Sequence, residues 1–208
     1  VLAPWWNQPD APAELAILQA TVQQGRHEFD AARQVLSAAL ARAPGQAQGW
    51  LNLAALERLS ARYAPAMRAC EQVARAGQAW YARACRLETL ALQSHAVEAV
   101  QGLQQLLLET QDDAQKSWLA SLLAEAWERT GHDRQAASAY QRSLALSPDL
   151  YTAIAYADLL LRTGQPHRVV PVLAELPATD AVLLRRATAW RSLGDARWVN
   201  TRELLRQS

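Results

Sequence analysis

The sequence offers few side chains that could carry out chemistry, and its four histidines are the first to consider. His27, His95, His132 and His167 each fall at or near a predicted turn between two helices. Packed helices lie about 8 to 10 Å apart, so histidines on successive turns are too distant to share a zinc ion, whose ligands lie about 2 Å from it. We therefore expect polar turn residues and no metal site.

Cys70 and Cys85 are the two cysteines, and they fall on predicted helices that should touch each other. A disulfide needs α-carbons within about 7 Å, which adjacent helices provide only when both side chains face the seam. Cysteines are also common as small apolar core residues. Two buried thiols are the simpler interpretation, and a disulfide remains open.

Glu125 and Glu128 lie three residues apart and would share one face of a helix, as a pair of catalytic carboxylates would. No glycine-rich phosphate loop, CxxC pair, HExxH helix or GxSxG turn accompanies them. Without a closed pocket or a third group that tunes their pKa values, solvated or groove-lining carboxylates are the simpler interpretation. The sequence predicts no catalytic residue, no cofactor and no enzymatic activity.

The elements that position these side chains are clearest in residues 117–148. Apolar or small residues recur at steps of three and four over 118–129, which predicts a helix that ends at Gly131. A second stripe over 136–144 predicts another helix, which Pro148 ends. Because so short a turn joins them, the two helices should form an antiparallel hairpin.

This hairpin resembles the tetratricopeptide repeat in the residues Ala120, Leu123, Ala124, Trp127, Ala136, Tyr140 and Pro148. Ala120 stands where the repeat usually has a large residue, and Trp118 nearby offers the missing volume. The resemblance implies an all-α fold, a right-handed α-α superhelix (solenoid) of about six such helical hairpins. Weaker copies on both sides agree with it, since Ala66 follows Ala32 by the 34 residues of this repeat.

The predicted domain organisation is an extended lead-in rich in Pro and Trp, followed by the solenoid. Trp5 or Trp6 of the lead-in should dock on the first helices; the alternative is that the lead-in is a linker to an upstream segment. Residues 110–116 are predicted as a lengthened connection, and Pro171 should leave a short helix that begins near Arg168. The lead-in covers residues 1–12 and the solenoid 13–208, with repeats at about 13–45, 46–77, 78–111, 115–148, 150–177 and 180–208.

Composition narrows the classes of partner. The 21 basic and 20 acidic residues are balanced along the chain, so no basic tract indicates nucleic-acid binding. No apolar run approaches the roughly 20 residues of a membrane span, so we expect no membrane insertion. Lys116 is the one lysine among many arginines, which suggests GC-rich coding and a bacterial protein.

The resemblance also implies a partner-binding groove, because stacked hairpins form a concave surface lined mainly by first helices. In this family the groove commonly receives an extended peptide or a helix of another protein. A second interpretation is that Trp118 and Tyr151 pack between repeats and that the charges are ordinary surface. The candidate groove residues are Gln48, Leu51, Arg58, Trp118, Ser121, Glu125, Arg129, Tyr151, Asp158, Arg162, Arg185 and Arg191.

Two functions follow as hypotheses. The first is a non-enzymatic scaffold that binds a peptide or partner protein in its concave groove. The second is a structural or assembly subunit of a bacterial envelope or secretion complex, acting through its ends or convex face, with a homodimer through Trp198 and Leu205 of the last repeat as one form. The first residue is Val1 and the chain holds two cysteines, features that fit an exported protein and also a cytosolic fragment; we favour the periplasm.

Overall fold

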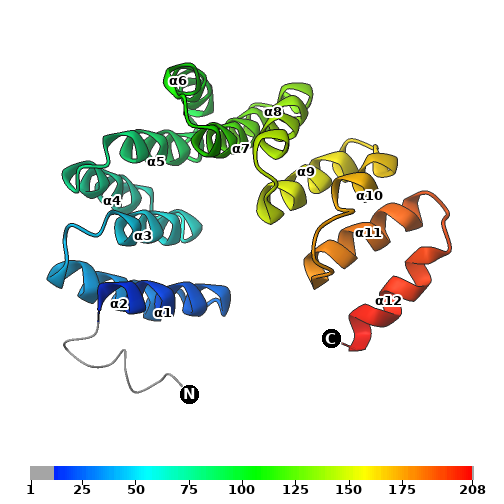
Figure 1. Cartoon of the computed structure of the whole chain (residues 1–208), viewed down its shortest axis with the longest axis horizontal. Helices are drawn as coiled ribbons and strands as arrows, with labels where there is room; N and C mark the ends of the chain where they lie inside the picture. Colours follow the sequence, from blue (N-terminus) through cyan, green and yellow to red (C-terminus); the bar gives the residue numbers. More distant parts are fainter. Residues whose placement is uncertain (1–11, 208) are drawn as a thin grey trace. The chain divides into compact units, whose positions relative to one another are not determined.

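The computed structural model describes residues 12–207, apart from the side chains of residues 202 and 204–207. Twelve α-helices and no strand occur in this part of the chain (Figure 1). The predicted all-α fold is therefore confirmed. The predicted docking of Trp5 or Trp6 lies outside the described residues.

The chain forms two compact units, residues 1–99 and 100–208, here called unit 1 and unit 2. Helix α6 contains the division between them. The helices before it are α1 (Ala13–Gly25), α2 (Phe29–Arg42), α3 (Ala47–Leu59), α4 (Tyr63–Arg75) and α5 (Ala79–Ala91), and α6 spans Ala96–Glu109. Those after it are α7 (Asp113–Arg129), α8 (Asp133–Leu146), α9 (Leu150–Arg162), the 3₁₀ helix η1 (Pro166–Arg168), α10 (Val169–Val172), α11 (Asp180–Ser192) and α12 (Arg197–Gln207).

Consecutive helices pack as hairpins within each unit. Unit 1 contains the pairs α1 with α2 and α3 with α4, and unit 2 contains α7 with α8 and α11 with α12. In the same way α9 packs against η1 and α10. The repeat boundaries as such remain a prediction, because they define a sequence period and not helix ends.

The core of unit 1 joins successive hairpins. Ile17, Leu36, Leu40 and Leu56 form one buried cluster. Gly49 lies against this cluster, and a Cβ added to it would lie 2.8 Å from Cδ2 of Leu40. The small residue therefore lets α3 approach the first hairpin closely.

A disulfide joins Cys70 of α4 to Cys85 of α5, with α-carbons 5.7 Å apart. The simpler interpretation of two buried thiols is therefore wrong for this chain. Both side chains face the seam between the two helices and pack with Ala54 and Ala69. This orientation is what a bond between adjacent helices requires.

Glu57 in α3 is a buried carboxylate at the position where the tetratricopeptide repeat usually has an aromatic residue. Arg33 of α2 donates a 3.1 Å hydrogen bond to its Oε1. Arg62, before α4, places Nε 3.2 Å from the other oxygen in an ion pair without hydrogen-bond alignment. A buried carboxylate needs such partners, and here they connect α3 to α2 and to the turn that precedes α4.

The core of unit 2 combines small and aromatic residues. Ala124 of α7 and Ala136 of α8 are completely buried, which lets the two helices approach closely. Tyr140 and Tyr156 are the largest fully buried side chains, and their ring centroids lie 5.8 Å apart. The tyrosines thus fill the space between α8 and α9.

Helix α7 begins earlier than the sequence pattern predicts. Its first residue is Asp113, and the side chain of Asp112 accepts a 2.8 Å hydrogen bond from the backbone N–H of Gln115. This is an N-cap, which satisfies a backbone N–H that the helix itself leaves free. The predicted lengthened connection over 110–116 is therefore wrong, and only residues 110–112 separate α6 from α7.

The turns between the paired helices share one backbone conformation. The residue two positions before the next helix has a positive φ at His27, Ala61, Ser94, Gly131 and Gly164. Glycine adopts this left-handed conformation without strain, whereas the other three residues do so at a cost. Ser94 fills this position between α5 and α6 and Ala61 between α3 and α4, two turns for which the sequence offers no glycine.

The second helix of the fifth hairpin is short, as predicted. After η1, α10 covers only four residues, and Pro171 lies within it. Arg186 of α11 donates to the carbonyl oxygens of Leu173 and Ala174, the latter at 3.0 Å. The arginine therefore caps the chain where the helix stops.

Candidate protein-binding face on α7, α9 and α11

Two ion pairs connect successive first helices in unit 2. Arg185 of α11 forms a bidentate pair with Asp158 of α9, through Nε at 2.8 Å and Nη2 at 2.7 Å. Arg162 of α9 places Nη2 2.8 Å from Oε2 of Glu128 in α7, and 3.0 Å from Oδ1 of Asp133 at the start of α8. Asp158 and Arg185 of the predicted groove therefore pair with each other, whereas Arg162 pairs with two carboxylates that the prediction did not include.

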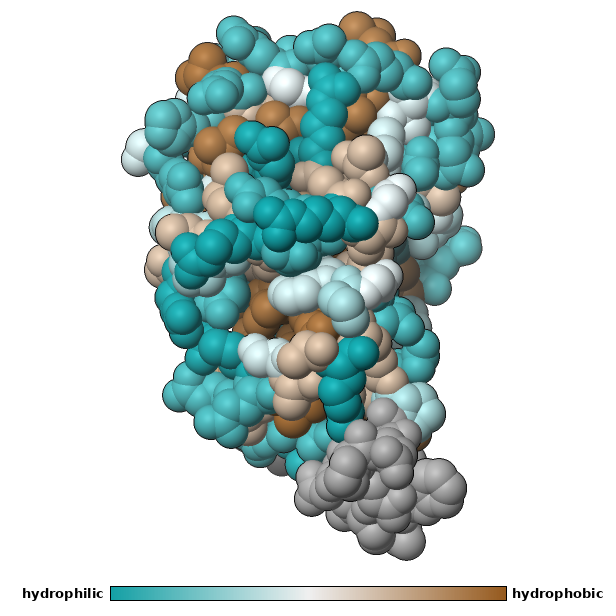
Figure 2. Space-filling model, turned by 90° about the vertical axis from the view of Figure 1, so that its left-hand side faces the viewer, coloured by the Kyte–Doolittle hydropathy of each residue, from teal (hydrophilic) through white to brown (hydrophobic). Residues whose placement is uncertain are grey.

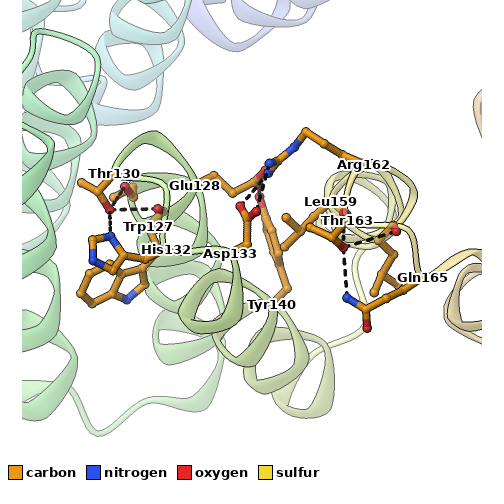
Figure 3. A network of polar contacts seen from close by, with 12 residues as sticks. Trp127, Glu128, Thr130, His132, Asp133, Tyr140, Leu159, Arg162, Thr163 and Gln165 are labelled. Atoms are coloured by element: carbon orange, nitrogen blue, oxygen red, sulfur yellow. Dashed lines mark hydrogen bonds and ion pairs between the residues drawn. The ribbon is translucent and has the colours of Figure 1, made fainter.

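Glu128 is the centre of this network (Figure 3). The hydroxyl of Tyr140 donates a 2.6 Å hydrogen bond to Oε1 of Glu128, while Arg162 contacts Oε2. Burial first, and then the hydrogen bond to the Glu128 carboxylate, raises the pKa of Tyr140 far above its usual value. The tyrosine is therefore a neutral hydrogen-bond donor at physiological pH.

An open pocket of about 330 Å³ lies on this face. Two carboxylates, Glu125 and Glu128, and two guanidinium groups, Arg129 and Arg162, line it. Such a lining offers both donors and acceptors for the charged side chains and backbone groups of a polypeptide. The structure thus brings three of the predicted groove residues together with Glu128, the other member of the i, i+3 carboxylate pair.

The other predicted residues of unit 2 differ in how much surface they offer. Tyr151 of α9 is 79% exposed, so it does not pack between repeats as the second interpretation proposed. Arg191 of α11 is exposed, and Trp118 of α7 is half-buried. Ser121 is buried, and its hydroxyl donates a 2.8 Å hydrogen bond to the carbonyl of Trp118 within the same helix.

The three predicted groove residues of unit 1 all belong to α3. Gln48 is exposed and bonds Asn52 one turn along α3. Leu51 packs against the cluster that holds the disulfide. Arg58 is nearly buried and forms a 2.8 Å ion pair with Glu88 of α5. Leu51 and Arg58 therefore serve mainly the packing of α3 on α5.

His27, His95 and His132 lie in turns between helices, as predicted, whereas His167 lies in η1, just after the turn at Gly164. His132 precedes α8, where Nδ1 lies 2.9 Å from Oγ1 of Thr130 and the ring packs against Trp127 (Figure 3). Within the described part of the chain, no group of three His, Cys, Asp or Glu side chains could hold a metal ion.

Among the residues that the structure describes, no helix is both long and apolar enough to span a bilayer. Hydrophilic side chains cover most of the face shown in Figure 2, and hydrophobic ones appear between them in small separate areas.

These features define a class of protein: the fold is that of the tetratricopeptide-repeat proteins, as the resemblance implies. No protein-family model matches the sequence. No curated protein matches it either. The fold class therefore comes from solved structures.

Three of these structures are close in fold and distant in sequence. TTC0263, a TPR protein of Thermus thermophilus, superposes with a TM-score of 0.69 at 16% identity, covering 85% of this chain and 98% of its own. PilW, a type IV pilus biogenesis factor, superposes with a TM-score of 0.65 at 14% identity, covering 94% of this chain and 93% of PilW. The Rap protein complexed with Competence and Sporulation Factor gives 0.69 at 11% identity, covering 96% of this chain and 65% of Rap.

Proposed function

We propose that this protein is a non-enzymatic scaffold that binds a peptide or a partner protein on the face formed by α7, α9 and α11. The observation that carries the proposal is the pocket lined by Glu125, Glu128, Arg129 and Arg162. Its mixed charges suit a polypeptide better than a phosphate chain, which would require an excess of positive charge.

The exposure of Tyr151 supports a protein partner. Tyr151, Asp158 and Arg162 follow one another at steps of seven and four residues, so they lie along one stripe of α9. Tyrosine and arginine are enriched among the residues that dominate binding at protein interfaces. The stripe thus combines an aromatic anchor with the charged pocket.

The fixed geometry of the charged residues supports a role in binding. Glu128 is held by Tyr140 and Arg162, and Asp158 is held by Arg185. A preformed set of donors and acceptors binds a partner with little ordering cost. The Rap protein, of similar fold, was solved in complex with Competence and Sporulation Factor, which agrees with a binding role for this one.

The test replaces two groove residues whose side chains are exposed to solvent, Tyr151 and Arg129. We expect Tyr151→Ala combined with Arg129→Glu to abolish retention of the wild-type partner in a pull-down from lysate of the source bacterium. The matched control combines Leu108→Ala with Arg142→Glu, which change an exposed apolar and an exposed basic residue on the second helices α6 and α8. Circular dichroism checks that both variants retain helical content.

The partner is then purified, and its affinity for each variant is measured. A loss of about tenfold or more with the groove variant alone supports the proposal. If both variants retain the partner equally, α7, α9 and α11 do not form the working surface.

The second candidate is an assembly subunit of a bacterial envelope complex. The disulfide supports it, because such bonds persist mainly in oxidising compartments such as the periplasm. PilW, whose fold is similar, is a pilus biogenesis factor. We expect an oligomer in light scattering that Trp198→Arg dissociates; a monomer at every concentration would argue against self-assembly through the last hairpin.

A further inference from the structure

The fifth hairpin lacks most of its second helix. The second helices α2, α4 and α8 contain 14, 13 and 14 residues. In contrast, α10 contains four residues after the three of η1, because Pro171 offers no backbone N–H and Pro177 follows soon afterwards. About two helical turns are therefore missing at the C-terminal end of this helix.

A pocket lies beside the place where those turns would run. In an antiparallel hairpin the end of the second helix lies next to the start of the first. The pocket contains Ala153, in the first half of α9, together with residues from the end of α8 and from α10. The missing turns would have covered these residues.

The pocket is about 480 Å³ in volume and mainly apolar. Its apolar lining residues include Leu144, Ala145, Pro148, Ala153, Val172 and Leu176. An apolar depression of this kind gains free energy when an apolar side chain enters and displaces water. It lies on the side of unit 2 formed by second helices, whereas the proposed binding face is formed by first helices.

The charge around the pocket is negative. Asp149 and Glu175 are among its lining residues, and no Lys, Arg or His is. Asp149 uses Oδ2 to accept a 2.7 Å hydrogen bond from the backbone N–H of Thr152. The carboxylate of Glu175 is exposed on the segment that follows α10. A basic side chain on the occupant would complement both carboxylates.

We propose that this pocket binds a short amphipathic helix of a partner protein, which supplies the turns that α10 lacks. The apolar face of that helix enters between α8, α9 and α10. A Lys or Arg on its edge pairs with Glu175 and Asp149. This surface is independent of the face that carries Tyr151 and Arg129.

The test selects ligands from random sequences, so the natural partner need not be identified first. A displayed library of random peptides of about 16 residues, long enough for several helical turns, is panned on the full chain with its disulfide intact. We expect enriched peptides to carry apolar residues at helical spacing and at least one Lys or Arg. The enriched peptides are then synthesised, and their affinities are measured by fluorescence anisotropy.

Two tryptophan variants locate the binding site. Ala145→Trp fills the pocket from the exposed last turn of α8, so it should weaken binding by about tenfold or more. Gln135→Trp adds the same side chain to an exposed position in the first turn of α8 and should change affinity less than about twofold. Circular dichroism and thermal melting check the folding of both.

Two charge variants test the role of the acidic rim. Glu175→Lys should lower the affinity for the basic peptides and raise the affinity for peptides in which the Lys or Arg is changed to Glu. Glu71→Lys, an exposed substitution on α4, should do neither. This reversal separates a charge-paired site from an apolar patch that binds non-specifically.

Four results would overturn the proposal, and three of them concern the peptides. They are no enrichment of peptides, enriched peptides that bind Ala145→Trp as well as the wild type, and peptides lost only with the Tyr151→Ala and Arg129→Glu variant. A dimer in light scattering that Ala145→Trp dissociates would also overturn it, because the occupant would then be a second copy of this chain.

Discussion

At the scale of single residues, the burial of Tyr140 makes the stability of the fold depend on pH. Its raised pKa means that the folded protein keeps the hydroxyl protonated where the unfolded chain releases its proton, at roughly pH 10. Above that pH the unfolded state binds fewer protons than the folded state, so stability falls as pH rises. Below it, the contribution of the hydroxyl is fully present.

We therefore expect Tyr140→Phe to lower the free energy of unfolding by about 1 to 3 kcal/mol near neutral pH, because Glu128 loses a charged hydrogen bond. Between pH 10 and 11 the difference in free energy of unfolding between wild type and variant should decrease by about 1 kcal/mol. Urea unfolding at several pH values measures both effects. Identical pH slopes for the two proteins would contradict the assigned protonation state.

The sequence could predict which charged residues lie on the groove face, but not which partners they contact. Helical spacing places Arg162 and Asp158 on one face, and the structure agrees with their exposure. Helical spacing alone could not indicate that Arg162 contacts Glu128, 34 residues earlier. Nor could it indicate that Asp158 contacts Arg185, 27 residues later. Such pairs depend on how hairpins stack, which periodicity within one helix does not specify.

At the scale of helices and turns, the shared left-handed residue gives a matched pair of variants. Ala61 has φ of 54° and Gly131 has φ of 76° at corresponding positions of two hairpin turns. Ala61→Gly should raise the free energy of unfolding by about 0.5 to 1 kcal/mol, since relief of strain exceeds the entropy that glycine gains when unfolded. Gly131→Ala should lower it by a similar amount.

Urea unfolding of the two variants and the wild type checks this prediction. Gly25→Ala is the control, since Gly25 closes α1 without a positive φ and has no atom within 4 Å of an added Cβ. It should be neutral or slightly stabilising. Destabilisation by Ala61→Gly would show that the turn conformation does not determine the effect.

Helix ends were predictable where their signals lie within the apolar pattern. Pro171 correctly predicts a short α10, because proline acts on the helix that contains it. The start of α7 was missed because its N-cap, Asp112, lies in a polar stretch without periodicity. The turn at Ser94 has no such signal, since serine gives no indication of a positive φ.

At the scale of the whole molecule, the all-α fold follows from composition and repeated hairpins, and comparison with TTC0263 and PilW agrees with it. The disulfide could not be predicted from composition and repeated hairpins. Whether Cys70 and Cys85 face each other depends on the rotation of α4 and α5 about their axes. An error of one residue in helical register turns a side chain by about 100°, which is enough to decide the question.

Reduction of the disulfide should lower the thermal unfolding midpoint of the chain. A cross-link that closes a loop of this size, with a sequence separation of 15 between the cysteines, stabilises the folded state by roughly 3 kcal/mol in the chain-entropy model. Calorimetry with and without a reductant measures the shift. A Cys70→Ala and Cys85→Ala double variant should melt at the lower temperature under both conditions, and a reductant effect on that variant would invalidate the assignment.

The same cross-link has a mechanical consequence. A row of hairpins that is pulled from its ends lengthens as each hairpin opens, with up to about 3.5 Å released per residue. The covalent tie between α4 and α5 withholds the segment from Cys70 to Cys85 from that extension, because force passes through the sulfur atoms. The oxidised chain is therefore shorter at full extension by about 50 Å, and the redox state of the compartment sets how far it can stretch.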